Sequence, residues 1–367
     1  MKTPIYLDNA ATTPITKPVF DAMMPYLTEQ FGNPSSLYSL GRMAHKAVET
    51  AREQIATAIN AEPSQILFTS GATESNNWVC SQFHHILCSP YEHHSILNHP
   101  NVTPMSQIIS CNVSSQIIAL RLGIEMEYPD LVTFMSVNNE TGVIYSVPNM
   151  TDICHRCNTF FHTDATQAFG HIPINVKKLD CDFLSLSGHK FHAPKGVGIL
   201  YIKEPDKFKP FLYGGQQENH LRAGTENVAS IVGMGKAAEL YNYSPERDNR
   251  CRKIQNKFVD AFSYWQDVYF NTDIASSISS TLNVAFKNVE SESLMLLLNM
   301  DGICVSAGSA CNSASLEPSH VLKAIGTPED YIYNSIRLSW DDTLTDEEVD
   351  YVIESIKKNV MKVRCYI

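Results

Sequence analysis

The sequence has no apolar run that approaches the roughly 20 residues needed to cross a bilayer. Its first residues, "MKTPIYLDNAATTP", contain one lysine followed by Pro4 and Asp8, and they lack the apolar core of a signal peptide. An excess of positive charge is also missing: the formal net charge is −11, whereas nucleic-acid binding needs a concentrated basic surface. These absences predict a cytoplasmic protein that binds neither a membrane nor DNA.

The sequence also lacks a regular cysteine framework. Its ten cysteines are irregularly spaced, and in a large chain without a secretory signal they are expected to be reduced thiols. Cys154 and Cys157, in "CHRC", match the spacing of a redox motif or of half a zinc site, but no second pair follows at zinc-site spacing. We therefore interpret this pair as the end of a helix before a strand, and we expect no metal.

The central part of the 367-residue chain alternates between short apolar strands and helical or loop segments. Strands are expected in "QILFTS", "HHILC", "LVTFMSV", "TFFHTDA", "DFLSLS" and "GVGILYI". This rhythm predicts an α/β fold with a mainly parallel sheet covered by helices. Ligands gather beyond the carboxyl ends of such strands, and the polar clusters "SGATESNN", "NNETG", "DATQ" and "SGHK" follow several of them directly. Functional residues are therefore expected along one edge of the sheet.

The C-terminal part predicts a smaller α+β domain. Strands are expected in "TLNVAF", "GICVS" and "SIRLS", and a buried helix in "ESLMLLLNM". A last helix is expected to start at Thr345, which forms a capping box with Glu348. A turn signal in "NYSPERD" suggests a division into a large domain, residues 15–245, and a small domain, residues 1–14 plus 246–367.

Three strand ends carry residue types that suit one cofactor. The backbone N–H groups of Ala72 and Thr73, after Gly71, would cradle a phosphate at a helix N-terminus, although a simple capped turn explains them equally well. Lys190 follows a strand and could form a Schiff base, or it could be a surface lysine. Asp164 could pair with a protonated ring nitrogen, or it could cap a helix. A phosphate cradle, a ring-nitrogen acid and a Schiff-base lysine, in that order along the chain, match the needs of pyridoxal phosphate.

With these residues in place, the chain closely resembles the cysteine desulfurases, in the class V branch of the fold-type I pyridoxal-phosphate enzymes. The matching motifs run almost from end to end and stand in the same order. They are "YLDNAATTP", "FGNPSS", "ILFTSGATESNN", "EHHSIL", "VNNETGVI", "HTDATQAFG", "SGHKFHAPKGVGILY", "LRAGTENV", "SAGSACNSASLEPSHVL" and "SIRLS". The resemblance implies a large pyridoxal-phosphate-binding α/β domain of the fold-type I transferase kind and a small α+β domain that carries the catalytic cysteine.

The resemblance implies a role for each matching residue. Lys190 would carry the cofactor, Asp164 would pair with its pyridine nitrogen, and His93 would stack on its ring and assist proton transfer. Asn139 and Gln167 would lie near the phenolic oxygen and the substrate. The phosphate would be bound by Ala72, Thr73, Ser187 and His189, and by Thr225 of the other subunit in a homodimer.

The resemblance also implies the reaction. Arg337, in "SIRLS", would bind the carboxylate of the substrate L-cysteine through a planar, bidentate pair. Lys190 would then move protons at the substrate α-carbon. Cys311 would take the sulfur as a persulfide, leaving alanine, and a sulfur-acceptor protein for iron–sulfur cluster assembly or tRNA thiolation would remove it.

Cys311 stands among small residues in "SAGSACNSAS", which favours a mobile loop and weak order around the thiol. Two other readings stay open: a selenocysteine lyase or related aminotransferase, and an inactive paralogue that serves as an assembly partner. The intact set of functional residues argues against the paralogue. A Cys311→Ala variant separates the enzymes, because an aminotransferase does not need this thiol.

The sequence departs from the family pattern in three places. Residues 99–129 suggest a shortened connection with little consequence for the site. Trp340, Asp341 and Asp342 stand where small or basic residues are common, and they are expected to alter the mouth of the site or partner docking. Asn312 follows the cysteine in place of serine or threonine.

Overall fold

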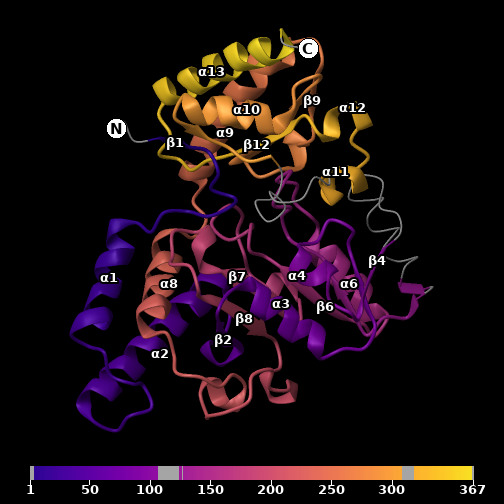
Figure 1. The fold of residues 1–367 in the computed structure, drawn as a ribbon. Helices are drawn as coiled ribbons and strands as arrows, with labels where there is room; N and C mark the ends of the chain where they lie inside the picture. Colours follow the sequence, from indigo (N-terminus) through magenta and orange to yellow (C-terminus); the bar gives the residue numbers. More distant parts are fainter. Residues whose placement is uncertain (1–3, 106–123, 126, 308–317, 366–367) are drawn as a thin grey trace.

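A computed structural model describes residues 4–105, 124–125, 127–307 and 318–365. Its main element is a seven-stranded sheet with the strand order β2-β8-β7-β6-β5-β3-β4 (Figure 1). All neighbouring strands are parallel except β8, which runs antiparallel to both β2 and β7. The expectation of a mainly parallel sheet is confirmed. The strands are β2 (Ile66–Thr69), β3 (Ile86–Cys88), β4 (Val102–Pro104), β5 (Leu131–Thr133), β6 (Phe160–Asp164), β7 (Phe183–Ser187) and β8 (Gly198–Ile202).

Most strands of this sheet are buried because helices cover it, whereas the edge strand β4 is largely exposed. Strands β2, β3, β5, β7 and β8 are buried along their whole length, as near-continuous apolar runs in a covered sheet should be. In Figure 1, α1, α2 and α8 group together, and both α1 and α2 pack against α8. The helices of this part are α1 (Lys17–Thr28), α2 (Ser39–Ile59), α3 (Ala72–Ser81), α4 (His94–Leu97), α6 (Val147–Arg156), α7 (Val176–Leu179) and α8 (Val228–Leu240).

A second, smaller sheet is built from the C-terminal part of the chain. Its strands β9 (Val268–Phe270), β10 (Thr281–Phe286) and β12 (Ser335–Ser339) pair antiparallel in the order β12-β10-β9. The strand β1 (Ile5–Tyr6) pairs with β11 (Ile303–Cys304), so the N-terminal segment lies with this part of the chain (Figure 1). The helices are α9 (Pro245–Ser263), α10 (Ser291–Met300), α11 (His320–Ala324), α12 (Glu329–Ile332) and α13 (Asp346–Arg364).

The apolar residues form separate clusters that follow these two sheets. The C-terminal cluster contains Leu7 from the N-terminal segment together with the buried faces of α9, α10 and α13. The capping box of Thr345 and Glu348 is present at the start of α13. The clusters agree with a two-part arrangement, and the division at residues 15 and 245 stays a prediction.

Short 3₁₀ helices complete the described fold, and one of them carries Lys190. They are η1 (Pro63–Gln65), η2 (Gly188–Lys190), η3 (Pro205–Lys207), η4 (Glu218–His220) and η5 (Ile274–Ser276). Much of the 99–129 connection lies outside the described residues, and so does the segment around Cys311. Within the described ranges, no helix is both long and apolar enough to cross a membrane.

The pair Cys154 and Cys157 lies where the sequence placed it, at the end of a helix before a strand. Helix α6 ends at Arg156, Cys157 is its C-cap, and β6 begins at Phe160. Cys154 is buried and Cys157 is exposed, and both are free thiols. Among the residues that the structure describes, no group of three or more His, Cys, Asp or Glu side chains could hold a metal ion.

Candidate active site

One cavity of about 600 Å³ lies where the large sheet ends, and it brings most of the predicted site residues together. Arg337, from strand β12 of the smaller sheet, lines the same cavity. The sequence expectation that the polar strand ends converge is therefore met in the structure. The predicted residues that line the cavity are Ala72, Thr73, His93, Asn139, Asp164, Gln167, Ser187, His189, Lys190 and Arg337.

The part of the cavity at the N-terminus of α3 is suited to bind an anion. Helix α3 starts at Ala72 directly after β2, and its first N–H groups have no partner within the helix. Gly71, before it, has φ +151°, in the region that favours glycine, and a Cβ on Gly198 of β8 would lie 2.6 Å from the Gly71 Cα. This close packing of two glycines brings backbone N–H groups, and the Ser187 and His189 side chains, to one place.

Lys190 lies in the 3₁₀ turn after β7, and the N-terminal segment lies against it. Its Nζ donates hydrogen bonds to the carbonyl oxygens of Ala10, at 2.6 Å, and Ala11, at 2.8 Å. Gln167 Nε2 donates to the same Ala10 oxygen at 2.9 Å. The Thr13 N–H donates to the His189 carbonyl at 2.8 Å. The "YLDNAATTP" motif therefore supplies backbone acceptors to the lysine amine, a role that sequence reasoning gave to none of its residues.

Asp164 ends β6 and is held at both carboxylate oxygens. The N–H of Thr166 donates to Oδ1 at 2.9 Å, and Asn76 Nδ2 donates to Oδ2 at 2.8 Å. Asp164 is buried, and Asn76 is completely buried in the second turn of α3. These two neutral donors hold the carboxyl group in a fixed orientation, which suits an acceptor for the N–H of a ring nitrogen.

Two imidazoles of the cavity are kept neutral. Burial is the main cause that lowers the pKa of His93; Asp164 opposes this shift, and Lys190 adds to it. Burial, together with Lys190 and Lys195, lowers the pKa of His189 to about 4. At neutral pH both rings therefore act as hydrogen-bonding groups without a full charge.

Arg337 is the only arginine that lines this cavity among the described residues, and it is almost completely buried, at 1% exposure. Its Nη1 donates to the Asn139 carbonyl at 2.8 Å, and its Nη2 donates to Asp8 Oδ1 at 2.7 Å. The Nε–H is buried without a hydrogen-bond partner among the described residues. A buried guanidinium with unused donors suits the binding of a carboxylate.

The two described ends of the segment that contains Cys311 are attached beside this cavity. Ser306, before the segment, exchanges backbone hydrogen bonds with Arg337. Ser319, after it, donates from its Oγ to Glu140 Oε2 at 2.6 Å. Cys311 itself, and the predicted weak order around it, lie outside the described residues.

Thr225 does not line the cavity of its own chain. It is exposed, three residues after Arg222, whose Nε donates to Glu74 Oε1 in the first turn of α3 at 2.9 Å. The role implied for Thr225 is in the other subunit of a dimer, and it stays a prediction.

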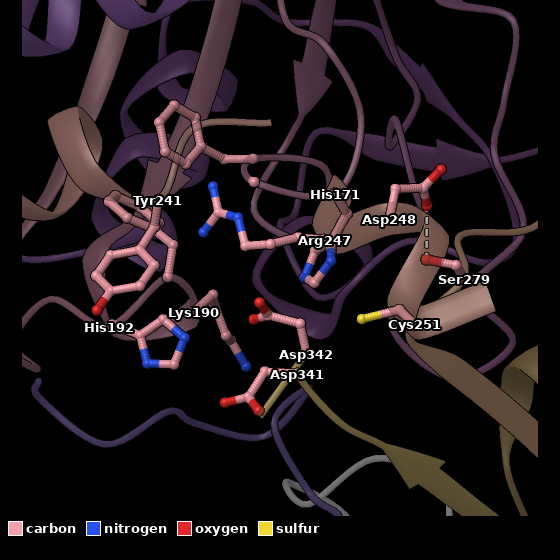
Figure 2. A pocket seen from close by; sticks show the side chains of 13 residues that line it. His171, Lys190, His192, Tyr241, Arg247, Asp248, Cys251, Ser279, Asp341 and Asp342 are labelled. Carbon is pink, nitrogen blue, oxygen red and sulfur yellow. Dashed lines mark hydrogen bonds between the residues drawn. The ribbon is translucent and has the colours of Figure 1, made fainter. Parts of the chain in front are cut away.

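Asp341 and Asp342 line a second, small pocket of about 60 Å³ and are absent from the residues that line the larger cavity. Figure 2 shows their carboxylates in this pocket together with His171, His192 and Arg247. Trp340, at 1% exposure, packs against Phe258 in the C-terminal cluster. Lys190 lines both the small pocket and the larger cavity, so the two aspartates lie in a pocket next to the lysine. The expected effect of this departure on the mouth of the site or on partner docking stays a prediction.

The residues of the larger cavity fit pyridoxal phosphate. The N-terminus of α3 with Ser187 and His189 offers an anion cradle, Asp164 offers an acceptor for a ring N–H, and Lys190 offers an amine for the aldehyde. His93 lines the same cavity. Together these groups define a lysine-based pyridoxal-phosphate site on a fold-type I α/β scaffold.

Comparison with known proteins gives the family. The model of the family described as aminotransferase class-V matches residues 5–352, and the chain belongs to this pyridoxal-phosphate-dependent family. A protein named cysteine desulfurase IscS from Methanosarcina thermophila is 42% identical over 98% of this chain and 93% of its own length. A solved NifS-like protein superimposes with a TM-score of 0.89 at 33% identity, over 98% of this chain and 100% of that one. A structure described as SspA in complex with cysteine has a TM-score of 0.77 at 32% identity, over 91% and 98% of the two chains.

Proposed function

We propose that this protein is a pyridoxal-phosphate-dependent cysteine desulfurase, which converts L-cysteine to L-alanine and transfers the sulfur to Cys311 as a persulfide. The observation that carries this proposal is the single cavity that contains Lys190, Asp164, His93 and Arg337. The relatives named cysteine desulfurase, 40–42% identical over nearly the whole chain, support it.

Different residues of the cavity have different roles in this reaction. Arg337 binds the substrate carboxylate with donors that Asp8 and Asn139 leave unused. Asp164 holds a proton at the ring nitrogen, and pyridoxal phosphate supplies an electron sink when it is bound. The Lys190 amine, positioned by the Ala10 and Ala11 carbonyls, is the base that moves protons at the substrate α-carbon.

The sulfur step needs a thiolate that reaches the substrate. The Cys311 sulfur attacks the substrate sulfur, an S–S bond forms, and the C–S bond breaks with its electron pair going to the carbon side. That carbon takes up a proton, and alanine leaves. The backbone hydrogen bonds between Ser306 and Arg337, which lines the cavity, support this assignment, and so does the hydrogen bond from Ser319 to Glu140, because Ser306 and Ser319 flank the Cys311 motif in the sequence.

Four further parts of the proposal concern the surroundings of the site. We propose a homodimer in which Thr225 reaches the phosphate of the other subunit, a cytoplasmic location, and a sulfur-acceptor protein. We also propose that the sulfur serves iron–sulfur cluster assembly or tRNA thiolation. Incubation with ³⁵S-labelled cysteine, followed by identification of the protein that receives the label, tests the last two.

The experiment that tests the function measures the alanine, the enzyme-bound persulfide and the sulfide formed from L-cysteine. The Cys311→Ala variant should bind pyridoxal phosphate normally and form none of these products, whereas Cys157→Ala, at an exposed cysteine, should match the unchanged protein. Unchanged sulfide release by Cys311→Ala would overturn the persulfide step and favour an aminotransferase or lyase. A protein that stays colourless with added pyridoxal phosphate would favour an inactive paralogue.

A further inference from the structure

A chain of hydrogen bonds joins Asp164 to His93 through two residues to which sequence reasoning gave no role. Asn76 Nδ2 donates to Asp164 Oδ2 at 2.8 Å and to Ser95 Oγ at 2.9 Å. Ser95 Oγ lies 2.9 Å from His93 Nδ1. The chain therefore connects the end of β6, the helix α3 and the start of α4, and it ends on two residues that line the cavity.

The orientation of the Asn76 amide is set by the carboxylate. If the amide were turned over, its oxygen would face Asp164 Oδ2 at 2.8 Å, and two acceptors would repel each other. In the observed orientation both amide hydrogens are used, while Asn76 Oδ1 is buried with no hydrogen-bond partner among the described residues. Leaving a buried acceptor unpaired costs free energy, so the two donated bonds determine how this side chain lies.

The direction of the last hydrogen bond follows from the backbone. The N–H of Ser95 donates to His93 Nδ1 at 3.1 Å, because His93 is the N-cap of α4 and accepts one of the free N–H groups of its first turn. A proton on Nδ1 would point at this N–H. Nδ1 is therefore an acceptor, and the Ser95 hydroxyl, which already accepts from Asn76, donates its own hydrogen to Nδ1.

We propose that Asn76 and Ser95 are positioning residues that fix His93 as the tautomer with its proton on Nε2, and that His93 therefore takes part in the reaction as a proton donor at Nε2. Use of the proton in catalysis rests on the proposed desulfurase function, whereas the tautomer does not. The titratable groups that influence the His93 ring are Asp164, which raises its pKa, and Lys190, His94 and His320, which lower it. A ring without a fixed tautomer would present either a donor or an acceptor at Nε2. The hydrogen-bond chain fixes the tautomer with a donor at Nε2 before substrate binds.

The first test needs no variant of the network and no turnover. The full-length protein, labelled with ¹⁵N in histidine, is studied by NMR at neutral pH, as purified and after removal of pyridoxal phosphate, and a His93→Gln variant assigns the resonances. Expected are a protonated Nε2 and an unprotonated Nδ1 in both samples. A protonated Nδ1 would overturn the inference, even if the enzyme desulfurates cysteine normally.

The second test uses Ser95→Ala and Asn76→Ala, with Asn77→Ala as the matched control. Asn77 also lies on α3, but its Nδ2 donates only to the backbone carbonyls of Thr73 and Ser95 and not to the Ser95 hydroxyl or to Asp164 in the described hydrogen bonds. Loss of one hydrogen bond to the ring, worth about 1 kcal/mol, should lower the ratio of Nε2–H to Nδ1–H tautomers about fivefold in Ser95→Ala. Asn76→Ala should change it in the same direction, and Asn77→Ala should leave it unchanged. An unchanged ratio in both network variants, or an equal change in the control, would overturn the role of these residues.

Discussion

Replacement of Arg337 by lysine is the sharpest test of how this site binds its substrate. Arg337→Lys keeps the positive charge but replaces a planar fork of five N–H donors by one ammonium group. In the structure the guanidinium spans from Asp8 Oδ1 to the Asn139 carbonyl, with its Nε–H still unpartnered among the described residues. A lysine ammonium cannot hold both contacts and a substrate carboxylate in the same plane.

The magnitude follows from the number of charge-assisted hydrogen bonds that are lost. A substrate carboxylate bound by two such bonds would keep one of them in the variant, and one charge-assisted bond is worth about 1.5–3 kcal/mol. Because each 1.36 kcal/mol is a factor of ten in rate, kcat/KM for L-cysteine should fall about 10- to 160-fold. Most of the loss should be in KM, since the carboxylate is bound equally in the ground state and in the transition state.

The assay is alanine formation over a range of cysteine concentrations, with the absorbance of bound pyridoxal phosphate as a check on the folded site. Arg250→Lys is a suitable control, because Arg250 pairs with Asp346 and the Leu344 carbonyl and does not line the cavity. A value of kcat/KM within twofold of the unchanged protein would refute the role of Arg337. The same loss in Arg250→Lys would show that the effect is general.

Three further predictions concern the scaffold. Arg52→Ala breaks a buried bidentate pair with Glu218 and should lower the free energy of unfolding by about 3–5 kcal/mol in urea denaturation, whereas Lys17→Ala, in an exposed pair, should cost less than about 1 kcal/mol. Burial lowers the pKa of His162 to about 4, below its unfolded value of 6.5, so stability should fall as the pH falls from 6.5 to about 4. His162→Gln should make this dependence shallower, and an unchanged slope would contradict the assignment. Gly198→Ala would place its Cβ against backbone, so it should lower the free energy of unfolding by about 1–3 kcal/mol and weaken pyridoxal-phosphate binding; an unchanged melting temperature would count against the glycine packing.

Much of the fold could be predicted because its signals are local. Except for β4, the strands of the large sheet are short apolar runs, and each overlaps the segment where it was expected, since burial on both faces requires such runs. Strand β5 ends at Thr133, four residues before the expected run ends, and β4 was not predicted, because it lies at the edge of the sheet and is largely exposed. The capping box at Thr345 is likewise a contact between residues three apart. In contrast, the "GICVS" segment forms a strand of only two residues, β11, because its length depends on pairing with β1 from the other end of the chain.

The candidate residues of the site could be recognised from the sequence, but the hydrogen bonds that hold them could not. The strand ends with Asp164 and Lys190 could be recognised from the residue types and their order. The Ala10 and Ala11 carbonyls could not, because they are backbone groups about 180 residues away from the lysine that they hold. Asn76 stands inside a motif that the sequence pointed to, yet nothing in that motif shows that its amide faces a carboxylate 88 residues further on.

The sequence by itself determined the chemistry of this protein: an amine, a carboxylate, an imidazole and an anion cradle, each placed after a strand, together with Cys311 among small residues. Only the tertiary structure decided how these groups are oriented, which backbone oxygens hold Lys190, and where the guanidinium of Arg337 enters from the second sheet. The physical reason is that residue types are encoded locally, whereas the direction of a hydrogen bond and the tautomer of a histidine depend on neighbours that only folding brings together.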